Sequence, residues 1–157
     1  MITSRRSLIR MSPEEIQRYL GEQRRIIVVT IGQDGMPHPV PMNYGIDDEG
    51  RIIITTFRKS QKIANLERDP RATLLVESGD TYHELKSVIV YADAEIVLDP
   101  DRIADNMRRV RSSDLLVATK TPEMEQQIRA SMAKRAVVLF TPYKYVSWDH
   151  AKLGQNY

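Results

Sequence analysis

The sequence contains no cysteine. Disulfide bridges, zinc–thiolate sites and a thiol nucleophile are therefore excluded, and the absence suits a reducing compartment. Long hydrophobic runs are absent too, because the longest, Ile26–Ile31, is far too short to span a bilayer. The N-terminal residues around Arg5, Arg6 and Arg10 lack the apolar stretch that a signal peptide needs. From these absences we expect a cytoplasmic protein.

Neither sign of charge is in large excess. The 23 Lys and Arg residues nearly balance the 21 Asp and Glu residues, which gives a formal net charge of +2. The densest basic clusters, Arg24–Arg25 and Arg108–Arg111, lack interleaved aromatic residues and fit a solvated surface better than a nucleic-acid interface. A length of 157 residues without internal repeats or a low-complexity linker suits a single domain over residues 1–157.

Aromatic residues and histidines are scarce. The only tryptophan, Trp148, lies in a polar C-terminal segment, where it either docks on its own domain or stacks near a ring system, including one in a neighbouring subunit. The three histidines, His38, His83 and His150, have no metal-ligand spacing. Composition permits a Ser-His-Asp triad, but no serine lies in a nucleophile-elbow context. We expect no metal site.

The first half of the chain predicts one helix followed by a β-meander. Ser12–Glu15 has the pattern of a capping box with proline at the first helical position. The β-branched run Arg25–Ile31 and the following Asp34-Gly35 predict a hairpin. The return strand, His38–Gly45, must be an edge strand, be bulged or leave backbone unpaired, because prolines flank or interrupt it. Those prolines are Pro37, Pro39 and Pro41.

The second half alternates between helical and strand patterns. A strand over Arg51–Phe57 is followed by a short helix that begins at Ser60 and stops at Asp69-Pro70. Further strands are predicted over Arg71–Glu77, Val88–Val97, Ala136–Thr141 and Lys144–Trp148, and further helices over Asp99–Arg111 and Pro122–Lys134, whereas Ser112–Lys120 is ambiguous. Short strands joined mostly by hairpins indicate a mainly β, barrel-centred fold. A parallel nucleotide-binding sheet would need a glycine-rich first turn, which is missing.

The densest polar cluster, Thr55–Lys62, lies where a predicted strand ends and a helix begins. A helix N-terminus exposes unpaired N–H groups and the positive end of the helix dipole, which together favour an anion. Basic and hydroxyl side chains would complete a phosphate site there. Those side chains are Arg58, Lys59, Lys62, Thr56 and Ser60. The alternative is an ordinary capped helix whose charged residues are solvated.

Three motifs in order resemble one known family. Lys59–Arg71 resembles the central motif of the pyridoxamine-phosphate-oxidase-like split barrels. Gly79–Tyr82 followed by Ala94–Val97, together with the tail Ser147–Gly154, is similar to the flavin/deazaflavin oxidoreductases that use coenzyme F420. The resemblance covers about residues 12–154. It implies a six-stranded antiparallel split β-barrel with peripheral helices, assembled as a back-to-back homodimer with two cofactor sites between the subunits.

The resemblance also implies roles for particular residues. Lys59, Ser60, Gln61 and Lys62 would bind the cofactor phosphate, and Thr55 and Thr56 would follow the ribityl chain and the ring edge. Pro39, Val40, Pro41 and Met42 would border the ring, and Trp148 and Lys152 would reach over from the partner subunit. His38 and Tyr82 are candidates for substrate contact.

The sequence departs from true pyridoxamine-phosphate oxidases in two places. Val40–Tyr44 lacks the arginine that those enzymes use for the FMN phosphate, and the C-terminus lacks their basic substrate motif. We therefore expect not vitamin B6 oxidation but hydride transfer from reduced F420 to an activated double bond of a small molecule, completed by a solvent proton. An FMN-dependent oxidoreductase, a non-enzymatic flavin-binding protein and a haem-handling barrel, in which His38 would matter, remain alternatives.

Overall fold

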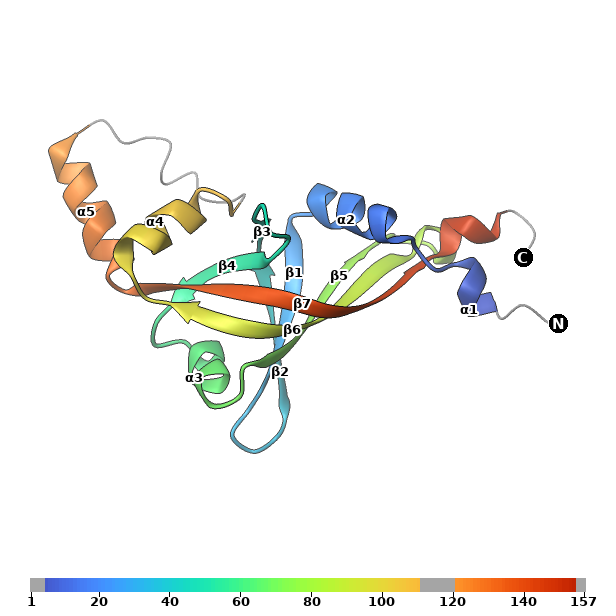
Figure 1. The fold of residues 1–157 in the computed structure, drawn as a ribbon, viewed down its shortest axis with the longest axis horizontal. Helices are drawn as coiled ribbons and strands as arrows, with labels where there is room; N and C mark the ends of the chain where they lie inside the picture. The colour runs from blue at the N-terminus through green and yellow to red at the C-terminus, as the bar shows by residue number, and fades with distance from the viewer. Residues whose placement is uncertain (1–4, 111–120, 155–157) are drawn as a thin grey trace.

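A computed structural model describes residues 5–110 and 121–154 of the chain (Figure 1). The ambiguous segment Ser112–Lys120 lies outside the described residues. The described part is built around one antiparallel sheet with the strand order β2-β1-β5-β6-β7-β4-β3. Its strands are β1 (Arg25–Ile31), β2 (Pro37–Asn43), β3 (Gly45–Ile46), β4 (Ile52–Phe57), β5 (Arg71–Ser78), β6 (Lys86–Val97) and β7 (Arg135–Asp149).

The helices lie between these strands and at the ends of the sheet. They are α1 (Arg5–Leu8), α2 (Pro13–Glu22), α3 (Gln61–Arg68), α4 (Pro100–Met107) and α5 (Pro122–Met132), with short 3₁₀ helices η1 (Tyr82–Glu84) and η3 (His150–Leu153). The predicted capping box of α2 is confirmed, because Ser12 accepts from the Glu15 amide and the Glu15 carboxylate accepts from the Ser12 amide. No helix among the described residues is both long and apolar enough to cross a bilayer.

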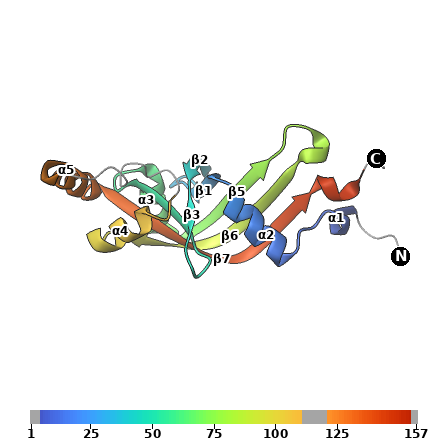
Figure 2. The ribbon, with the colours of Figure 1, turned by 90° about the horizontal axis from the view of Figure 1, so that it is seen from above.

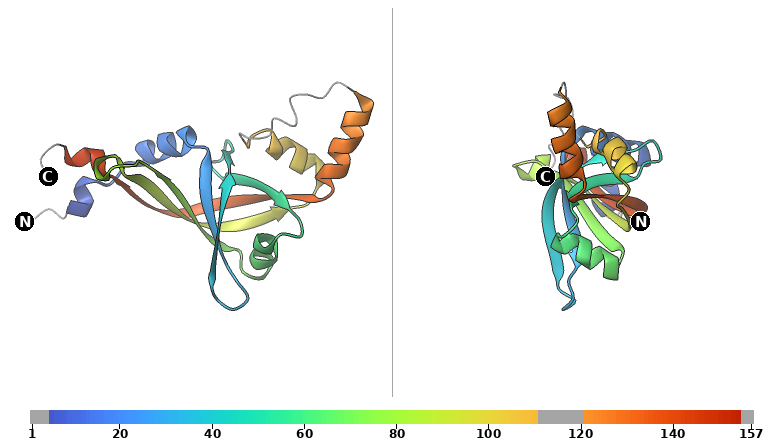
Figure 3. Two further views of the ribbon diagram at one scale, coloured as in Figure 1. Left: turned by 180° about the vertical axis from the view of Figure 1, so that it is seen from behind. Right: turned by 90° about the vertical axis from the view of Figure 1, so that its left-hand side faces the viewer.

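The sheet closes into a barrel because consecutive strands lie at its opposite edges. β2 is one edge strand and β3 is the other, yet only Tyr44 separates them in the chain. The sheet must therefore curl until its two edges meet, as Figure 3 shows. Between them there is no β2–β3 ladder. The mainly β split-barrel prediction is confirmed, with six longer strands and the two-residue β3.

Two predicted strand boundaries are wrong. The return strand over His38–Gly45 ends at Asn43, and Gly45 pairs with Ile53 of β4 instead of with β1. The two strands predicted over Ala136–Thr141 and Lys144–Trp148 form one continuous strand, β7. Its ladder with β6 shifts register between Tyr91 and Ala92, where an extra residue of β7 is accommodated as an irregularity.

The interior of the barrel and the far side of β4 and β7 hold separate apolar clusters. Alternate residues of β1, β4, β5, β6 and β7 point inward, where α2 and α3 add side chains such as Leu20 and Ile63. On the outer face, α4 covers β4 and β7 through residues such as Ile103 and Leu139. Neither cluster includes the outward-facing residues of β1, β2 and β5. No helix within residues 5–110 and 121–154 adds side chains to that face of the sheet in either cluster.

Candidate functional site

Lys62, in the first turn of α3, is a buried cation. Lys62 is only 8% exposed, and its Nζ donates a hydrogen bond to Thr56 Oγ1 over 2.9 Å. None of the ion pairs formed by the described residues includes it. Burial accordingly lowers the pKa of Lys62 from its usual value. A buried ammonium group that lacks a carboxylate partner is costly, and a bound anion would compensate it.

The hydroxyl groups beside Lys62 come from β4 and from the start of α3. Thr56 points to the barrel interior, and its Oγ1 lies 3.3 Å from Ser60 Oγ. Ser60 is the N-cap of α3, yet its side chain makes no capping bond. The Ile63 amide donates to the Ser60 carbonyl over 3.1 Å, so the amides of Gln61 and Lys62 are the ones at this helix start that keep donor capacity for a ligand. Thr55 lies on the opposite face of β4 because successive strand residues alternate, so only one of the two predicted threonines faces Lys62.

The remaining basic residues of the predicted phosphate cluster take other places. Arg58 donates from Nε to the Arg135 carbonyl over 2.8 Å and from Nη2 to the Leu98 carbonyl over 2.7 Å. These bonds hold its guanidinium group on the backbone beside β7, away from Lys62. Lys59 is exposed. The basic cluster predicted from the sequence therefore reduces to one buried cation, Lys62, with the exposed Lys59 nearby.

A polar network that the sequence analysis missed anchors α3 to β1. Asn65 is fully buried and donates from Nδ2 to Thr30 Oγ1 over 2.9 Å. Its Oδ1 accepts from Gln61 Nε2 over 2.9 Å. Because Lys62 also donates to Thr56 of β4, hydrogen bonds connect α3 to both β1 and β4, which lie on different sides of the barrel. The sequence does contain a sign of this network, since the polar residue Asn65 lies between the apolar residues Ile63 and Leu66 on the buried face of the helix.

The predicted ring-bordering residues lie on two faces of β2. Met42 packs against the interior cluster, and Val40 and His38 follow on the same face. Pro39 and Pro41 are exposed and face the opposite way. The backbone bonds from the Gly32 amide to Met36 and from the Tyr44 amide to Arg24 fix the ladder, so these prolines occupy positions whose backbone points to the free edge. That edge therefore offers carbonyl acceptors but no N–H donors there.

His38 has a side-chain nitrogen that is buried without a partner. Among the described residues, His38 Nδ1 is the buried side-chain nitrogen or oxygen that makes no hydrogen bond. Such an atom costs about 1–3 kcal/mol unless a bound water or a ligand satisfies it. His38 lines a hollow of about 590 Å³ between the β1–β2 hairpin and α3, together with Gln61 and Asn65. The hollow thus reaches the first residue of α3.

The C-terminal residues predicted for the site lie at the other end of the molecule. Figures 1 and 2 place η3 and α3 toward opposite ends of the sheet. Lys152 donates to Glu15 Oε2 over 2.6 Å, and Trp148 lies opposite Ser87 on the outer face. Tyr82 packs its ring edge-on against His150, with 4.5 Å between centroids. One chain therefore does not bring Trp148, Lys152 or Tyr82 to Lys62.

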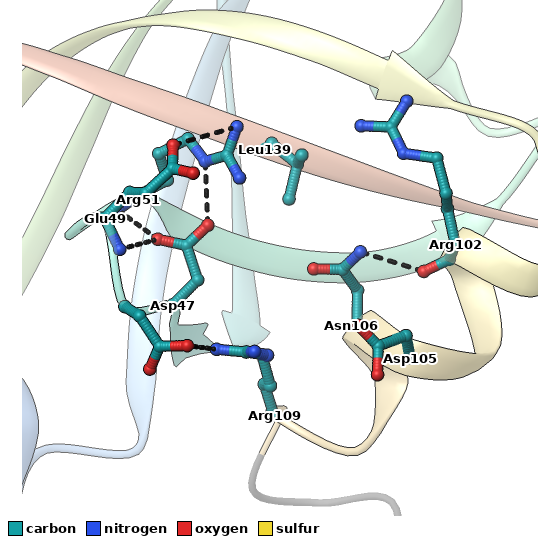
Figure 4. Close-up of a pocket in the computed structure, with 9 residues that line it drawn as sticks. Asp47, Glu49, Arg51, Arg102, Asp105, Asn106, Arg109 and Leu139 are labelled. Carbon is teal, nitrogen blue, oxygen red and sulfur yellow. Dashed lines mark hydrogen bonds and ion pairs between the residues drawn. The ribbon is translucent and has the colours of Figure 1, made fainter.

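A second pocket, between the β3–β4 turn and α4, contains none of the predicted residues (Figure 4). It has a volume of about 230 Å³ and is lined mainly by charged side chains. Arg51 pairs with Asp47 over 2.7 Å, and Arg109 pairs with Asp48 over 3.0 Å. These charges compensate one another, so the ion pairs give this pocket no net charge that would favour a charged ligand. Elsewhere in residues 5–110 and 121–154 no group of acidic and histidine side chains has metal-binding geometry.

Comparison with known proteins identifies the family. The pyridoxamine 5'-phosphate oxidase family matches residues 12–149. A conserved hypothetical protein of Mycobacterium tuberculosis is 38% identical, with a TM-score of 0.82 over 99% of this chain and 95% of its own. An F420 reductase is 23% identical, with a TM-score of 0.63 over 85% of this chain and 98% of its own.

An FAD-binding protein of Mesorhizobium loti has the same fold at 20% identity, with a TM-score of 0.63 over 88% of this chain and 93% of its own. No protein with a curated description matches the chain. At these identities the last two structures share the fold alone, whereas the match over residues 12–149 covers most of the sequence. The chain belongs to the pyridoxamine 5'-phosphate oxidase family of split barrels.

Proposed function

We propose that the protein is an F420-dependent oxidoreductase that transfers a hydride from the reduced deazaflavin to an activated double bond of a small molecule. The observation that carries this proposal is Lys62, a buried cation without a carboxylate at the start of α3. A buried ammonium, two hydroxyl groups and the amides at the start of α3 together suit a phosphate group. The cofactor would supply the hydride chemistry, and the protein would bind and orient it.

The charge of the site favours F420 over FMN. The F420 phosphate is a diester with a single negative charge, whereas a phosphate monoester such as that of FMN carries about −1.5 to −2 at pH 7. Lys62 supplies one buried positive charge, and Arg58 is committed to the Leu98 and Arg135 carbonyls. One buried cation at a helix N-terminus matches the diester, whereas a monoester would leave additional negative charge uncompensated in a buried site.

The uncovered outer face of the sheet supports a homodimer. Directly opposed residues on neighbouring strands share a face, and one such row is apolar throughout: Pro41, Ile27, Leu75, Ile89 and Val146. All of these except the exposed Pro41 are partly buried in the single chain. Trp148 lies on the same face. A second copy packed on this face would cover the row and carry its own Trp148 and Lys152 toward the first copy's site.

Placing a charge in this row is expected to separate the dimer. In the Leu75→Arg variant, the guanidinium group would have to be desolvated in the interface, so light scattering after gel filtration should report the mass of one chain. Gln17→Arg, on the exposed side of α2, adds the same charge and should leave the dimer intact. A Leu75→Arg protein that remains a dimer with an unchanged melting temperature would contradict this interface.

The residues of the chain position the cofactor and leave the final proton to the solvent. Lys62, Thr56, Ser60 and the first turn of α3 would hold the phosphate, and Val40 and Met42 of β2 would border the ring from the barrel side. Tyr82 would contact substrate from a neighbouring subunit, since in its own chain it packs against His150 of η3, toward the opposite end of the sheet from α3 (Figures 1 and 2). None of the residues assigned here is an acid or base paired for proton transfer.

A titration of apo-protein tests the proposal. The protein, made in a host without deazaflavin, is titrated with F420 and with FMN, and binding is followed by cofactor fluorescence. Tight F420 binding, weaker FMN binding and turnover of an activated alkene with reduced F420 are expected. Preference for FMN would assign the FMN-dependent alternative, and F420 binding without turnover of any acceptor would assign a binding protein. A Soret band on adding haem, with no affinity for either cofactor, would overturn the redox function.

A further inference from the structure

We infer that a second ligand site, for an amphipathic anion, lies between residues 7–17 and the C-terminal end of β7. The ligand would have an apolar body and one carboxylate or sulfonate group. The site is a hollow of about 620 Å³, here called the β7 hollow, which is lined by residues of segments 7–17 and 143–147 and by Lys152. Its volume is typical of small-molecule sites. The inference goes beyond the proposed function, because α3 lies toward the opposite end of the sheet (Figures 1 and 2).

Hydrogen bonds between distant segments hold the walls of the β7 hollow in place. Lys152 Nζ donates to the Arg10 carbonyl over 2.9 Å and to Glu15 Oε2 over 2.6 Å. The Met11 amide donates to Ser147 Oγ over 3.2 Å. The segment before α2 is thus bonded both to β7 and to η3. A ligand would enter a preformed site, which reduces the ordering cost of binding.

The β7 hollow has an apolar floor. Met11 and Ile16 line it and are buried members of the interior cluster. Pro13 and Tyr143 also line it, and the Tyr143 side chain is exposed. An aromatic ring or an aliphatic chain placed against these residues would be removed from water, which is favourable in proportion to the apolar area that is buried.

Tyr145 and Ser147 of β7 offer hydroxyl donors to the hollow. Their directly opposed partners on β6, Val90 and Val88, are buried inside the barrel, so both hydroxyl side chains leave the inner face of the sheet. Tyr145 Oη accepts from Gln17 Nε2 over 3.5 Å, and Ser147 Oγ accepts the backbone bond described above. Since each oxygen already serves as an acceptor, its O–H hydrogen remains for the oxygen of a ligand.

The charges around the β7 hollow favour an anion. Its lining contains three cations and one acid: Arg10, Lys144, Lys152 and Glu15. Glu15 pairs with Lys152, and Lys144 Nζ lies 5.4 Å from the centroid of the Tyr91 ring. Within residues 5–110 and 121–154, Arg10 takes part in no ion pair. One guanidinium group and two hydroxyl donors beside an apolar floor match a single carboxylate or sulfonate.

Two fluorescent probes that differ by one charge test the site. Anilinonaphthalene sulfonate (ANS) carries a sulfonate group, and N-phenylnaphthylamine has the same rings without it. Both become fluorescent in an apolar environment. ANS is expected to bind one site per chain about tenfold more tightly than the neutral amine. Equal affinities, or no saturable binding of ANS, would overturn the inference.

Substitutions test the polar groups of the β7 hollow. Arg10→Gln is expected to weaken ANS binding about fivefold and Tyr145→Phe about threefold, and neither should change the affinity for the neutral amine. Arg18→Gln is the matched control, because it removes the same charge from an exposed residue of α2 outside the hollow. It should leave both affinities unchanged. Unchanged ANS affinity in Arg10→Gln, at an unchanged melting temperature, would overturn the inference.

Methionine NMR locates the probe on the unmodified sequence. Met11 lines the β7 hollow, whereas Met42 packs against the barrel interior from β2 and Met107 lies in the outer cluster. With ¹³C-methyl-labelled methionine, the ring current of ANS is expected to shift the Met11 signal and to leave those of Met42 and Met107 in place. Shifts at Met42 or Met107 without one at Met11 would place ANS elsewhere and overturn the inference.

Competition with F420 separates this inference from the proposed function. F420 added to the ANS-loaded protein is expected to bind and to leave ANS in place. Displacement of ANS by stoichiometric F420 would make the hollow part of the cofactor site, so the second site would be overturned and the proposed function would stand. If F420 does not bind but ANS binds with the expected Arg10 dependence, the second site stands and the cofactor assignment fails.

Discussion

Replacing Lys62 with methionine is expected to weaken F420 binding by about 100-fold and, at the same time, to raise the free energy of unfolding by about 1–2 kcal/mol. The loss follows because Lys62 is the buried cation of the phosphate site. The gain follows because the empty protein keeps an ammonium group in a buried place without a carboxylate partner, and methionine retains most of its aliphatic stem. Urea unfolding and fluorescence titration measure the two effects on the same preparations.

The pH dependence of this stability gain has a definite sign. Burial lowers the folded-state pKa of Lys62 below its usual value of 10.5. Below the lowered pKa the group is charged in both states, and its destabilising contribution is complete. Between the lowered pKa and 10.5 the unfolded chain binds more protons than the folded one, so wild-type stability rises relative to Lys62→Met. The advantage of the variant should therefore shrink as pH increases through this window.

Lys59→Met is the matched control, since Lys59 carries the same charge three residues away and is exposed. Its free energy of unfolding should change by less than about 0.5 kcal/mol. Its F420 affinity should fall only slightly, and that loss should vanish at high salt. A Lys62→Met protein that loses stability along with binding would show that Lys62 is a structural residue, and the proposed phosphate site would lose its main support.

Local patterns predicted α3 and its polar start well. The strand ending near Phe57, Ser60 as the N-cap and the stop at Asp69-Pro70 all depend on residues close in sequence, and all are confirmed. The path of the chain after Asn43 could not be predicted from local sequence patterns. Whether Gly45 pairs with β1 or with β4 is decided by the closure of the barrel, which brings together residues far apart in the chain.

Some residues of the candidate site could likewise be predicted from local sequence patterns, and others could not. Strand alternation alone separates Thr55 from Thr56, so the sequence already held the reason to choose one of them. The position of Arg58 could not be foreseen, because the Leu98 and Arg135 carbonyls that hold it come from distant segments. Trp148 and Lys152 were expected to act across subunits. Within one chain, η3 with Lys152 and the adjoining end of β7 with Trp148 lie toward the opposite end of the sheet from α3 (Figures 1 and 2), so their action across subunits stays a prediction that the dimer experiments will test.

Gly45→Ala is expected to destabilise the protein by about 3 kcal/mol. Gly45 is buried at the start of β3, and a Cβ atom there would lie 2.1 Å from the carbonyl oxygen of Arg109 and 2.5 Å from its carbonyl carbon. Both are backbone atoms, so the clash can be relieved only by moving β3 away from the end of α4. Urea unfolding of the variant and the wild type measures the change.

Gly21→Ala provides the control, because a Cβ at Gly21 meets nothing within 4 Å and alanine favours the helix α2. It should raise stability by about 0.5–1 kcal/mol. The two variants make the same chemical change in opposite surroundings, so opposite signs would isolate the close approach at Gly45 as the cause. A Gly45→Ala protein as stable as wild type would mean that β3 can shift freely. The close approach of Gly45 to the Arg109 backbone would then contribute nothing to the stability of the barrel.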